Sequence, residues 1–487
     1  MVYIALLLSI FIPFGFGDLI FLIGLPKRPR NIYCMAVVCV ASALVFFCAA
    51  QGSIDTFTLI GVSERAGIAF RMDGLSKIFS CMLAVLWPVG TLYAFEYMSS
   101  KERTNAFFSF YTSCYGVSLG ICFAANLITM FIFCELLTIF ALPLIMHTRD
   151  SHSKQAGMRY LSFALMDAVA SIAGIIIIYE VTGRLDFNAG GIEGIHAGGT
   201  LMIFAFLLMF FGFGIKSAVV PFSSWLPSDA AAPAPVSALL NEVAIVNAGC
   251  FAIIRVSYYI YGAHYLFDTA AQKVAIIIAA LTITYGAIKA WQERNFKRRL
   301  AMSTVSNLSY ILYGAMLFTP LGLLGAWMHM LYHSIMKITL FLAAGAALHQ
   351  AGAENTDQLK GLGRKMPITF GALTIISLAL IGVPPLCGFY SKYFLGFAGM
   401  QVGTVYSYLG IAAILISTFF TAVYSLDIVI KAYFPGKDFD YTAIENVKDP
   451  DWKMTVPFIL LSILCILLSL FQREIYQFIT SCMQGLF

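Results

Sequence analysis

Six ionisable residues occur inside long apolar stretches of this sequence, where a charged side chain would meet little water. They are Glu135 in FIFCELLTIF, Lys216 in FFGFGIKSAVV, His329, His333 and Lys337 in HMLYHSIMK, and Lys392 in CGFYSKYFL. A charge at the centre of a bilayer costs at least about 2.5 kcal/mol on insertion scales. Each of these residues therefore needs a partner or a function.

The chemistry that these residue types suit is proton transfer. Burial disfavours the charged form of a lysine, whereas a nearby carboxylate favours it. If Lys216 gains and loses Glu135 as a partner, its affinity for a proton changes; a static buried ion pair is the alternative. Histidine titrates near pH ~6.5 and suits transfer between such sites. His329, His333 and Lys337 are four residues apart and so line one helix face over about 12 Å, although a packing role is the alternative for the histidines.

Other apolar stretches also hold polar residues. Glu242 and Asn247, in SALLNEVAIVNAGCF, are candidate relay groups. Because Glu242 lies near the start of its stretch, a helix cap facing a loop is the alternative. Asp167 and Asp427 are surrounded by apolar residues as well, but their role is ambiguous, so they are not included in the predicted path.

The composition indicates which elements must hold these groups. Of the 487 residues 60% are hydrophobic and only 11% are charged, and the mean hydropathy is +0.85, whereas a soluble domain has about 25% charged residues. The sequence therefore predicts a polytopic membrane protein whose first span begins at the N-terminus. The predicted spans, each about 20 residues or longer, cover 2–24, 31–51, 75–98, 106–125, 127–147, 158–181, 200–220, 233–261, 271–291, 299–317, 322–349, 367–397, 404–433 and 454–472.

Cations are distributed unevenly between alternate loops. One set holds Lys27, Arg28, Arg30, Lys101, Arg103, Arg149, Lys154, Arg159, Arg294, Lys297, Arg298, Arg299, Lys360, Arg364, Lys365, Lys437 and Lys448. The other set holds only Arg65, Arg71, Arg184, Lys273 and Arg473. Because cytoplasmic loops carry the excess of Lys and Arg, the first set is predicted in the cytoplasm and both termini on the outer side of the cell inner membrane.

Helix-breaking residues flank two of the buried lysines. Pro221, Pro227, Pro233 and Pro235 follow Lys216, whereas Gly382, Pro384, Pro385 and Gly388 precede Lys392. Interrupted helices are tolerated in a membrane where the freed backbone faces protein or a water-filled cavity. Two interrupted spans that lie five apart, the seventh and the twelfth, predict two inverted five-helix repeats.

The predicted fold class is therefore an all-α polytopic membrane protein with about fourteen transmembrane helices and broken helices 7 and 12. Its N-terminal helices 1–3 occupy residues 1–105, and the first repeat, helices 4–8, occupies 106–262. The inverted second repeat, helices 9–13, occupies 263–433. A C-terminal loop and helix 14 occupy 434–487.

The sequence offers no ligand set for a cofactor. Its eleven cysteines are scattered, with no C-x-x-C and no short cluster of Cys and His, so an iron–sulfur or structural zinc site is not predicted. Any redox cofactor of the system is expected on another chain. The basic run ERNFKRR at 293–299 is interpreted as a topology anchor, and no nucleic-acid partner is predicted.

Several long motifs resemble one family. KSAVVPFSSWLPSDAAAPAPVSALL, FKRRLAMSTVSNLSYILYGAM, HMLYHSIMKITLFLAAGA and GVPPLCGFYSKYFL are similar to segments of the antiporter-like, proton-translocating membrane subunits of respiratory complex I, of multisubunit Na⁺/H⁺ antiporters and of membrane-bound energy-converting hydrogenases. FRMDGLSKIF and LKGLGRKMPIT are also typical of that family. The resemblance covers about residues 70 to 430.

The resemblance implies roles for individual residues. Glu135 and Lys216 match the switchable pair of helices five and seven in that family, and Lys392 matches the terminal titrating group of helix twelve. The helix-eleven groups correspond to His329, His333 and Lys337. Many relatives carry a lysine or histidine in helix eight, where this sequence has Asn247 or Asn241. A water at Asn247 or the nearby Glu242 would complete the relay; the alternative is that the two half-channels are coupled less tightly than in relatives.

The resemblance also implies a function. The first interpretation is a proton-translocating or sodium-translocating subunit of a redox-driven pump, such as a membrane-bound hydrogenase or a complex I-like assembly. Its partners would be other membrane subunits and Fe–S or hydrogenase-type redox subunits on the cytoplasmic side, and this chain itself would catalyse no redox reaction. The short C-terminus favours the shorter type of complex I relative. The alternatives are a subunit of a multisubunit cation/proton antiporter without a redox partner, and an inactive membrane scaffold.

Overall fold

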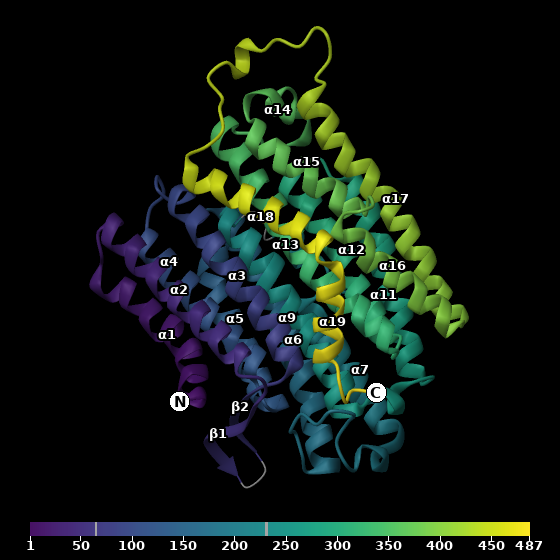
Figure 1. Ribbon diagram of the computed structural model, residues 1–487. Helices are drawn as coiled ribbons and strands as arrows, with labels where there is room; N and C mark the ends of the chain where they lie inside the picture. The colour runs from purple at the N-terminus through teal and green to yellow at the C-terminus, as the bar shows by residue number, and fades with distance from the viewer. Residues whose placement is uncertain (64–65, 229–231) are drawn as a thin grey trace.

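The computed structural model describes residues 1–63, 66–228 and 232–487 of the chain. Arg65, counted above among the outer cations, and residues 229–231 of the longest family motif lie outside the described residues. The described residues form a bundle of long helices with one small hairpin (Figure 1).

The first part of the chain begins at the side of the bundle that contains the N-terminus (Figure 1). Its elements are α1 (Val2–Ile23), α2 (Lys27–Ala50), β1 (Ile54–Ser63), β2 (Ala66–Met72), α3 (Gly74–Tyr97), α4 (Thr104–Phe123), α5 (Leu127–Ile145), α6 (Ser151–Thr182), η1 (Ile195–Gly198), α7 (Gly199–Lys216), α8 (Trp225–Ser228), η3 (Val236–Ile245), α9 (Val246–Arg255) and η4 (Val256–Tyr261).

The second part packs beside it, so that α13 contacts both α3 and η3. Its elements are α10 (Ala263–Leu266), α11 (Ala270–Gln292), α12 (Phe296–Met316), α13 (Pro320–Ala351), η5 (Thr356–Leu359), α14 (Leu362–Lys365), α15 (Pro367–Ile381), α16 (Cys387–Val402), α17 (Val405–Tyr433), η6 (Thr442–Ile444), α18 (Trp452–Leu470) and α19 (Gln472–Cys482).

The polytopic all-α fold is confirmed. Twelve helices of the described chain are long and apolar enough to cross a membrane. Helical segments also occupy the tenth and twelfth predicted spans, as α12 and as the pair α15 and α16, but these do not meet the same length and hydropathy measure. The number of fourteen spans, the inverted repeats and the domain boundaries stay predictions.

The two lysines lie at the interruptions that the prolines and glycines indicated. Helix α7 ends at Lys216, and the next short helix begins at Trp225. Helix α15 ends at Ile381, and its C-cap residue Gly382 has φ 90°, a left-handed conformation that favours glycine. Helix α16, which carries Lys392, begins five residues later. Both breaks therefore place a lysine beside backbone that has left the helix.

The eighth predicted span is unusual in its backbone. Within it, η3, of ten residues, and η4, of six residues, form π-helix on either side of α9. The wider π turn is rare and often occurs at functional sites. Glu242 lies within η3, and Asn247 follows at the start of α9.

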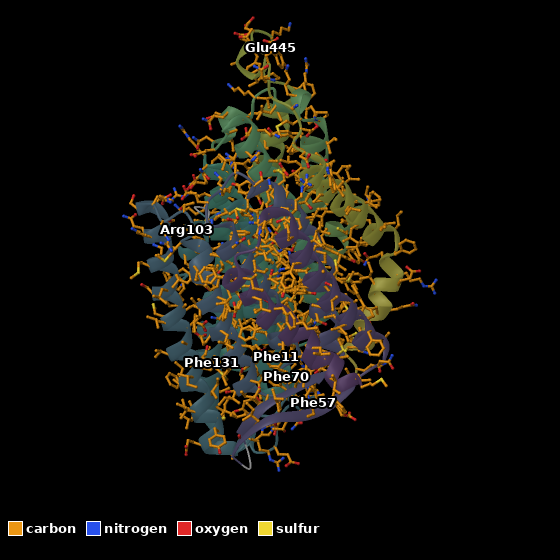
Figure 2. All side chains as sticks on the ribbon, turned by 90° about the vertical axis from the view of Figure 1, so that its left-hand side faces the viewer. Phe11, Phe57, Phe70, Arg103, Phe131 and Glu445 are labelled. Atoms are coloured by element: carbon orange, nitrogen blue, oxygen red, sulfur yellow. The ribbon has the colours of Figure 1, made fainter. Side chains whose placement is uncertain are left out.

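One loop of the sequence prediction is a hairpin. Residues 51–75 were predicted as a loop, but β1 and β2 pair antiparallel within it. The hairpin packs against the bundle because Asn126 donates to the Gly67 carbonyl at 2.8 Å and the Ala69 amide donates to Thr129 at 3.0 Å. Phe57 and Phe70 of the hairpin lie at the opposite end of the bundle from Arg103 and Glu445 (Figure 2).

The last predicted span corresponds to α18, which ends at Leu470, and a further helix follows this span. It was predicted to end at 472, with Arg473 in an outer segment, but the chain bends there and continues as α19. Helix α19 packs along α3 and α13, and a Cβ at Gly74 would collide with the Cys482 carbonyl. Both termini lie at the same end of the bundle (Figure 1). Which side of the membrane that end faces stays a prediction.

Candidate functional site

Lys216 is the centre of a buried ionic cluster. Its side chain is 5% exposed, and its Nζ lies 2.5 Å from Asp167 Oδ2 and 3.3 Å from Glu135 Oε1. The same ammonium donates to Thr138 Oγ1 at 3.1 Å. Three helices meet here, since α5 supplies Glu135 and Thr138, α6 supplies Asp167 and α7 ends at Lys216.

The nearer carboxylate was not part of the predicted path. Asp167 is completely buried, whereas the Glu135 side chain is 24% exposed at the edge of the cluster. Ser171, one turn along α6, holds the other Asp167 oxygen with a 3.0 Å hydrogen bond. Gly212, one turn before Lys216, is the sequence feature that points to this contact, because a Cβ there would collide with Ser171 of α6. That glycine lets α6 approach α7 closely enough for Asp167 to reach the lysine.

The carboxylates of this cluster outnumber its ammonium group, unlike in a simple ion pair. Two carboxylates face one ammonium, so the static pair of Glu135 and Lys216 is not a complete description of the site. An uncompensated charge is costly in a low-dielectric interior. The cluster therefore has room for one further proton, which either carboxylate could hold.

A second cluster lies where η3, α12 and α13 meet. Glu242 is fully buried and accepts a hydrogen bond from Thr304 of α12. Lys337 of α13 is also fully buried and donates to the Leu300 carbonyl at 2.8 Å and to Ser303. Ser303 and Thr304 are neighbours, so α12 links the carboxylate to the ammonium. The burial of Glu242 excludes the alternative that it is a cap facing a loop.

Two polar groups near the second cluster have incomplete hydrogen bonding. Asn247 donates to the Val243 carbonyl at 2.9 Å and to Ser334 Oγ at 2.8 Å, while its own oxygen has no protein partner among the described residues. Both ring nitrogens of buried His333 likewise lack a protein partner in the described part of the chain. Buried polar groups of this kind are ordinarily satisfied by internal water.

The predicted helix face is present on α13. His329 and His333 have ring centroids 5.8 Å apart, and Lys337 follows one turn later. His329 Nδ1 lies 3.0 Å from Ser391 Oγ, the residue before Lys392. This face therefore joins the second cluster to the break of the twelfth span.

Lys392 is held by backbone rather than by a carboxylate. Its Nζ donates to the Leu380 carbonyl at 2.8 Å and to the Ile381 carbonyl at 3.0 Å. These carbonyls belong to the last turn of α15 and have no intrahelical donor. Its ammonium also lies 5.7 Å from the ring centroid of Tyr310. Within the described residues Lys392 forms no ion pair.

The contacts fall into two groups that are not directly bonded to each other. His329, His333, Lys337 and Lys392 are linked through Ser391 and the face of α13. No hydrogen bond between described residues joins Lys216 directly to Glu242 or Lys337. Ser217, next to Lys216, donates to the Val246 carbonyl at 3.4 Å, which brings the first cluster beside Asn247.

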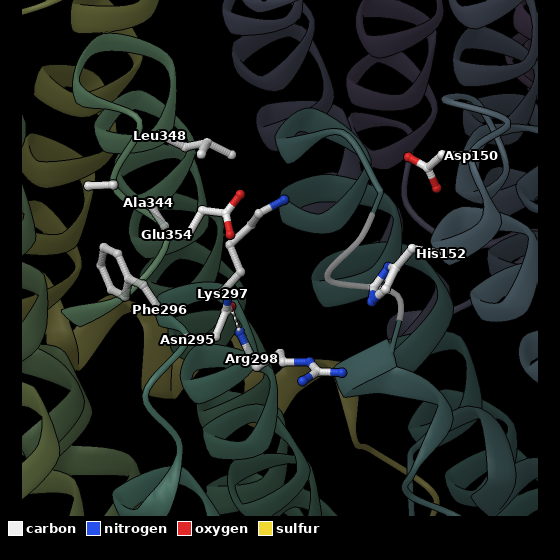
Figure 3. A pocket seen from close by; sticks show the side chains of 10 residues that line it. Asp150, His152, Asn295, Phe296, Lys297, Arg298, Ala344, Leu348 and Glu354 are labelled. Atoms are coloured by element: carbon white, nitrogen blue, oxygen red, sulfur yellow. Dashed lines mark hydrogen bonds between the residues drawn. The ribbon is translucent and has the colours of Figure 1, made fainter. Parts of the chain in front are cut away.

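A cavity opens near the second cluster at the end of the bundle rich in cations. It has a volume of about 360 Å³. Figure 3 shows Lys297 and Arg298 of α12 on one side of it and His152 and Asp150 on the other. Lys297 lies one turn before Leu300, whose carbonyl accepts the hydrogen bond from Lys337. The cavity therefore lies within two helical turns of the α12 residues that bind the buried ammonium.

A third ionic cluster occurs at the opposite end, and the sequence prediction missed it. Arg255, fully buried in α9, donates to both Asp73 oxygens at 2.5 and 2.7 Å, and Arg71 lies 2.8 Å from the same carboxylate. Burial alone would raise the pKa of Asp73, but Arg255 and Arg71 outweigh it and hold that pKa well below its usual range. By contrast, Asp427 pairs with Arg299 and Lys431 at the cation-rich end.

Two helix breaks that hold buried lysines, together with the buried carboxylates and histidines of the neighbouring helices, define an antiporter-like membrane subunit. Residues 124–421 match the family described as NADH:quinone oxidoreductase/Mrp antiporter, transmembrane. The match covers more than half of the chain, so the chain belongs to this family.

Curated relatives come from both kinds of complex. The chain is 31% identical over 404 residues to a probable K⁺/H⁺ antiporter protein of Rhizobium meliloti, covering 80% of this chain and 39% of that protein. It is 28% identical over 422 residues to NADH-quinone oxidoreductase subunit N of Desulforudis audaxviator, covering 84% and 83%. A putative antiporter subunit of Staphylococcus aureus is 31% identical over 424 residues, covering 81% and 51%. The chain thus spans about half or less of the two antiporter relatives.

Solved structures share the fold. The archaeal membrane-bound sulfane sulfur reductase contains a chain with TM-score 0.86 and 21% identity, covering 100% of this chain and 97% of that chain. The Mrp complex of a Dietzia species gives TM-score 0.83 at 21% identity, covering 99% and 97%. Respiratory complex I of Thermus thermophilus gives TM-score 0.83 at 22% identity, covering 99% and 100%. At these identities the likeness supports the fold alone.

Proposed function

We propose that this chain translocates protons, or sodium coupled to protons, as one membrane subunit of a larger ion-pumping complex. The observation that carries the proposal is the position of Lys216 between two carboxylates of unequal exposure, with Asp167 at 2.5 Å and Glu135 at 3.3 Å. Asp167 is the buried partner that keeps the lysine charged. Glu135, at the exposed edge, is the partner that changes.

The proposed transfer begins with a movement of Glu135 relative to Lys216. While both carboxylates contact the ammonium, the proton on Lys216 is held strongly. Withdrawal of Glu135 weakens that hold, and the proton then moves toward Asn247 and Glu242. Asn247 itself cannot carry a charge, so it orients water beside Ser217 and Ser334. Glu242 supplies the titratable group that other members of the family carry in helix eight as a base.

The second half of the proposed path follows α13. Lys337 receives the proton near Ser303, and His333 and His329 pass it along the helix face to Lys392. Histidine suits this step because its neutral ring both accepts and donates a proton. Lys392 is the terminal group, at the break between α15 and α16.

The parent complex belongs to the proposal as well. A redox-driven pump is our first candidate, since the similarity to NADH-quinone oxidoreductase subunit N of Desulforudis covers 84% of this chain. Fe–S or hydrogenase-type subunits on the cytoplasmic side would then supply the redox chemistry, with no cofactor on this chain. A multisubunit cation/proton antiporter is the second candidate, because the Rhizobium and Staphylococcus relatives are antiporter subunits.

The test is gentle purification from native membranes, followed by mass spectrometry of the partners and an iron assay on the intact particle. Stoichiometric iron–sulfur subunits would support the redox-driven pump. Small, iron-free membrane subunits would instead support the antiporter, and sodium-dependent pH changes in vesicles would then be measured. If the whole complex transports ions normally with Lys216→Ala, the chain is an inactive scaffold and the transport proposal is wrong.

The orientation is tested separately. We propose that the cation-rich end faces the cytoplasm and that both termini face outward across the cell inner membrane. A cysteine-reactive reagent that cannot cross the membrane should label a cysteine introduced at Gln484 in intact cells. It should label one introduced at Lys437 only after the cells are opened, and the reverse pattern would overturn the orientation.

A further inference from the structure

A pocket at the cation-rich end lies where α4 begins, α5 ends and α6 begins. It has a volume of about 430 Å³. Arg103, Arg149 and Lys154 line it together with an apolar wall that includes Phe110, Pro143 and Leu144. Figure 2 shows Arg103 toward the end of the bundle that carries Glu445. The pocket therefore combines three cations with an apolar surface at the ends of membrane-spanning helices.

The three cations that line this pocket have no acidic partner among the described residues. No carboxylate lines the pocket, and none of the three forms an ion pair with another described residue. Two carboxylates adjoin these cations in sequence: Asp150, next to Arg149, caps α6 by accepting from the Ser153 amide at 2.6 Å, and Glu102, next to Arg103, forms no ion pair with a described residue. At the same end of the bundle, Arg299 and Lys431 are both paired with Asp427. The pocket therefore presents uncompensated positive charge.

The backbone at two of these cations is also unusual. Arg103 has φ 52° and Arg149 has φ 57°, in the left-handed region that residues with a Cβ rarely adopt. The two turns are connected, because His147 Nε2 lies 3.1 Å from the Glu102 carbonyl oxygen. Strained positions persist where the surrounding structure fixes them, and they concentrate at binding sites. The connection keeps the two arginines on one pocket.

The apolar wall continues toward the lipid. Ile139, one turn before Pro143 on α5, is 62% exposed on a helix of membrane-spanning length. A ligand that fills this site needs an anionic group for the cations and a hydrocarbon chain for the wall. Basic pockets between transmembrane helices at the cytoplasmic side bind anionic lipid headgroups.

We propose that the pocket binds one anionic phospholipid. Its phosphate would contact Arg103, Arg149 and Lys154, and an acyl chain would lie along Pro143 and Ile139. The site connects the ends of α5 and α6, the helices that carry Glu135 and Asp167. A bound lipid would therefore restrain the two helices whose carboxylates contact Lys216. Binding itself does not depend on the proposed transport function.

The experiment is native mass spectrometry of the purified full chain or its complex, titrated with phosphatidylglycerol and with phosphatidylcholine. One variant combines Arg103→Gln, Arg149→Gln and Lys154→Gln. The matched control combines Lys27→Gln, Lys360→Gln and Lys437→Gln, which removes three exposed cations outside the pocket. Each pocket cation should contribute about fivefold to the affinity for phosphatidylglycerol. The pocket variant should therefore lose tightly bound phosphatidylglycerol, whereas the control should keep it.

Further variants and competing ligands identify the bound anion and show whether a loss of binding comes from misfolding. Lys154→Gln alone lies within α6 and should still weaken binding about fivefold, whereas Arg149→Lys should bind nearly as well as the native chain. Equal losses in the control would reduce the site to general surface charge and overturn the proposal. Equal retention of phosphatidylcholine, or displacement of the lipid by inorganic phosphate alone, would also overturn it. So would an acidic partner protein filling the pocket in the intact complex without lipid.

Discussion

Lys216 and Lys392 both lie beside an interruption in a membrane span, but their partners differ. Lys216 is the last residue of α7 and contacts the carboxylates of Asp167 and Glu135. Lys392 lies one and a half turns into α16 and donates to carbonyls at the end of α15. Two similar breaks in the backbone therefore hold a lysine by full charges in one case and by dipoles in the other.

This difference has a consequence for proton transfer. Two carboxylates require a cation near them, because an uncompensated buried charge costs several kcal/mol. Backbone carbonyls need only a hydrogen-bond donor, which both an ammonium and a neutral amine provide. The first site is therefore built to hold a proton until a carboxylate moves, and the second site is built to bind a proton and release it.

Removal of the Lys216 amine should have the largest effect. Lys216→Ala should lower ion transport by the complex about a hundredfold or more, since it removes the group that holds the proton. Transport is measured as pH change in vesicles that contain the purified complex. Lys289→Ala is the matched control, because Lys289 is an exposed lysine of the apolar helix α11 and its loss should leave transport unchanged. Equal losses in both variants would remove Lys216 from the mechanism.

The two carboxylates at Lys216 should not be equivalent. Asp167→Asn should lower the free energy of unfolding by about 3 kcal/mol, because it removes the fully buried partner of a buried cation. Glu135→Gln should lower transport but change stability much less, since its side chain is 24% exposed and lies farther from Lys216. Thermal unfolding and vesicle transport on the same preparations measure both. Similar stability losses would show that the two carboxylates share one role.

At the second break, the donor should matter more for stability than the charge. Lys392→Met leaves the Leu380 and Ile381 carbonyls without their donor and should cost about 2 kcal/mol of stability. Lys392→Gln keeps a neutral donor and should restore part of that loss while transport stays low. If Lys392→Gln is as unstable as Lys392→Met in thermal unfolding, the lysine is held by its charge and the contrast with Lys216 is wrong.

The sequence allowed the main groups of the path to be predicted, because an ionisable residue in an apolar stretch is visible without coordinates. Glu135, Lys216 and the basic face of α13 were found in that way. Asp167 was equally visible, but its partner depends on which face of α6 meets α7, and Gly212 decides that. Arg255, in the eighth predicted span, was visible in the same way, but its partner Asp73 comes from a loop far away in the sequence, so this cluster was not predicted.

Other features were beyond pattern reasoning because tertiary contacts produce them. The π turns around Glu242 depend on packing against α12 and α13, and nothing in the local sequence distinguishes them from α-helix. The hairpin β1–β2 was not predicted because it lies in a short segment between two spans, and only the pairing of its two halves makes them strands. Helix α19 follows α18 after a bend, so the end of the apolar run was taken as the end of the helix.

The middle of the proposed path can be tested by removing the titratable group at Glu242 and introducing another one at Asn247. Glu242→Gln should lower transport about tenfold, because a neutral amide replaces the buried titratable group. Adding Asn247→Lys places a base where many relatives carry one, beside Ser334, and should recover much of that loss. Asn247→Leu in the same background, matched in size but without polar atoms, should recover none. If Glu242→Gln transports normally, Glu242 is not the relay.

The smallest effect on transport should come from the Asp73 cluster, which provides a static reference for the Lys216 cluster. One carboxylate here faces two arginines, so it has no reason to take up a proton near neutral pH. Because the folded-state pKa of Asp73 is held below its unfolded value of about 3.9, its contribution to stability is present above pH ~4 and is lost as the pH falls through the folded pKa.

Asp73→Asn should therefore lower the free energy of unfolding by about 3 kcal/mol at pH 7, because it leaves the fully buried Arg255 without its carboxylate, and this difference from the native chain should shrink below pH ~4. Thermal unfolding between pH 7 and pH 3 measures it. Asp55 is an exposed carboxylate at the same end of the bundle and forms no ion pair with the described residues. Asp55→Asn should therefore leave the free energy of unfolding unchanged between pH 7 and pH 3. A difference that persists at the lowest pH would show that Asp73 acts through its shape and not its charge. A difference that already fades near pH 6 would mean that this cluster, like the one at Lys216, exchanges protons in the working range.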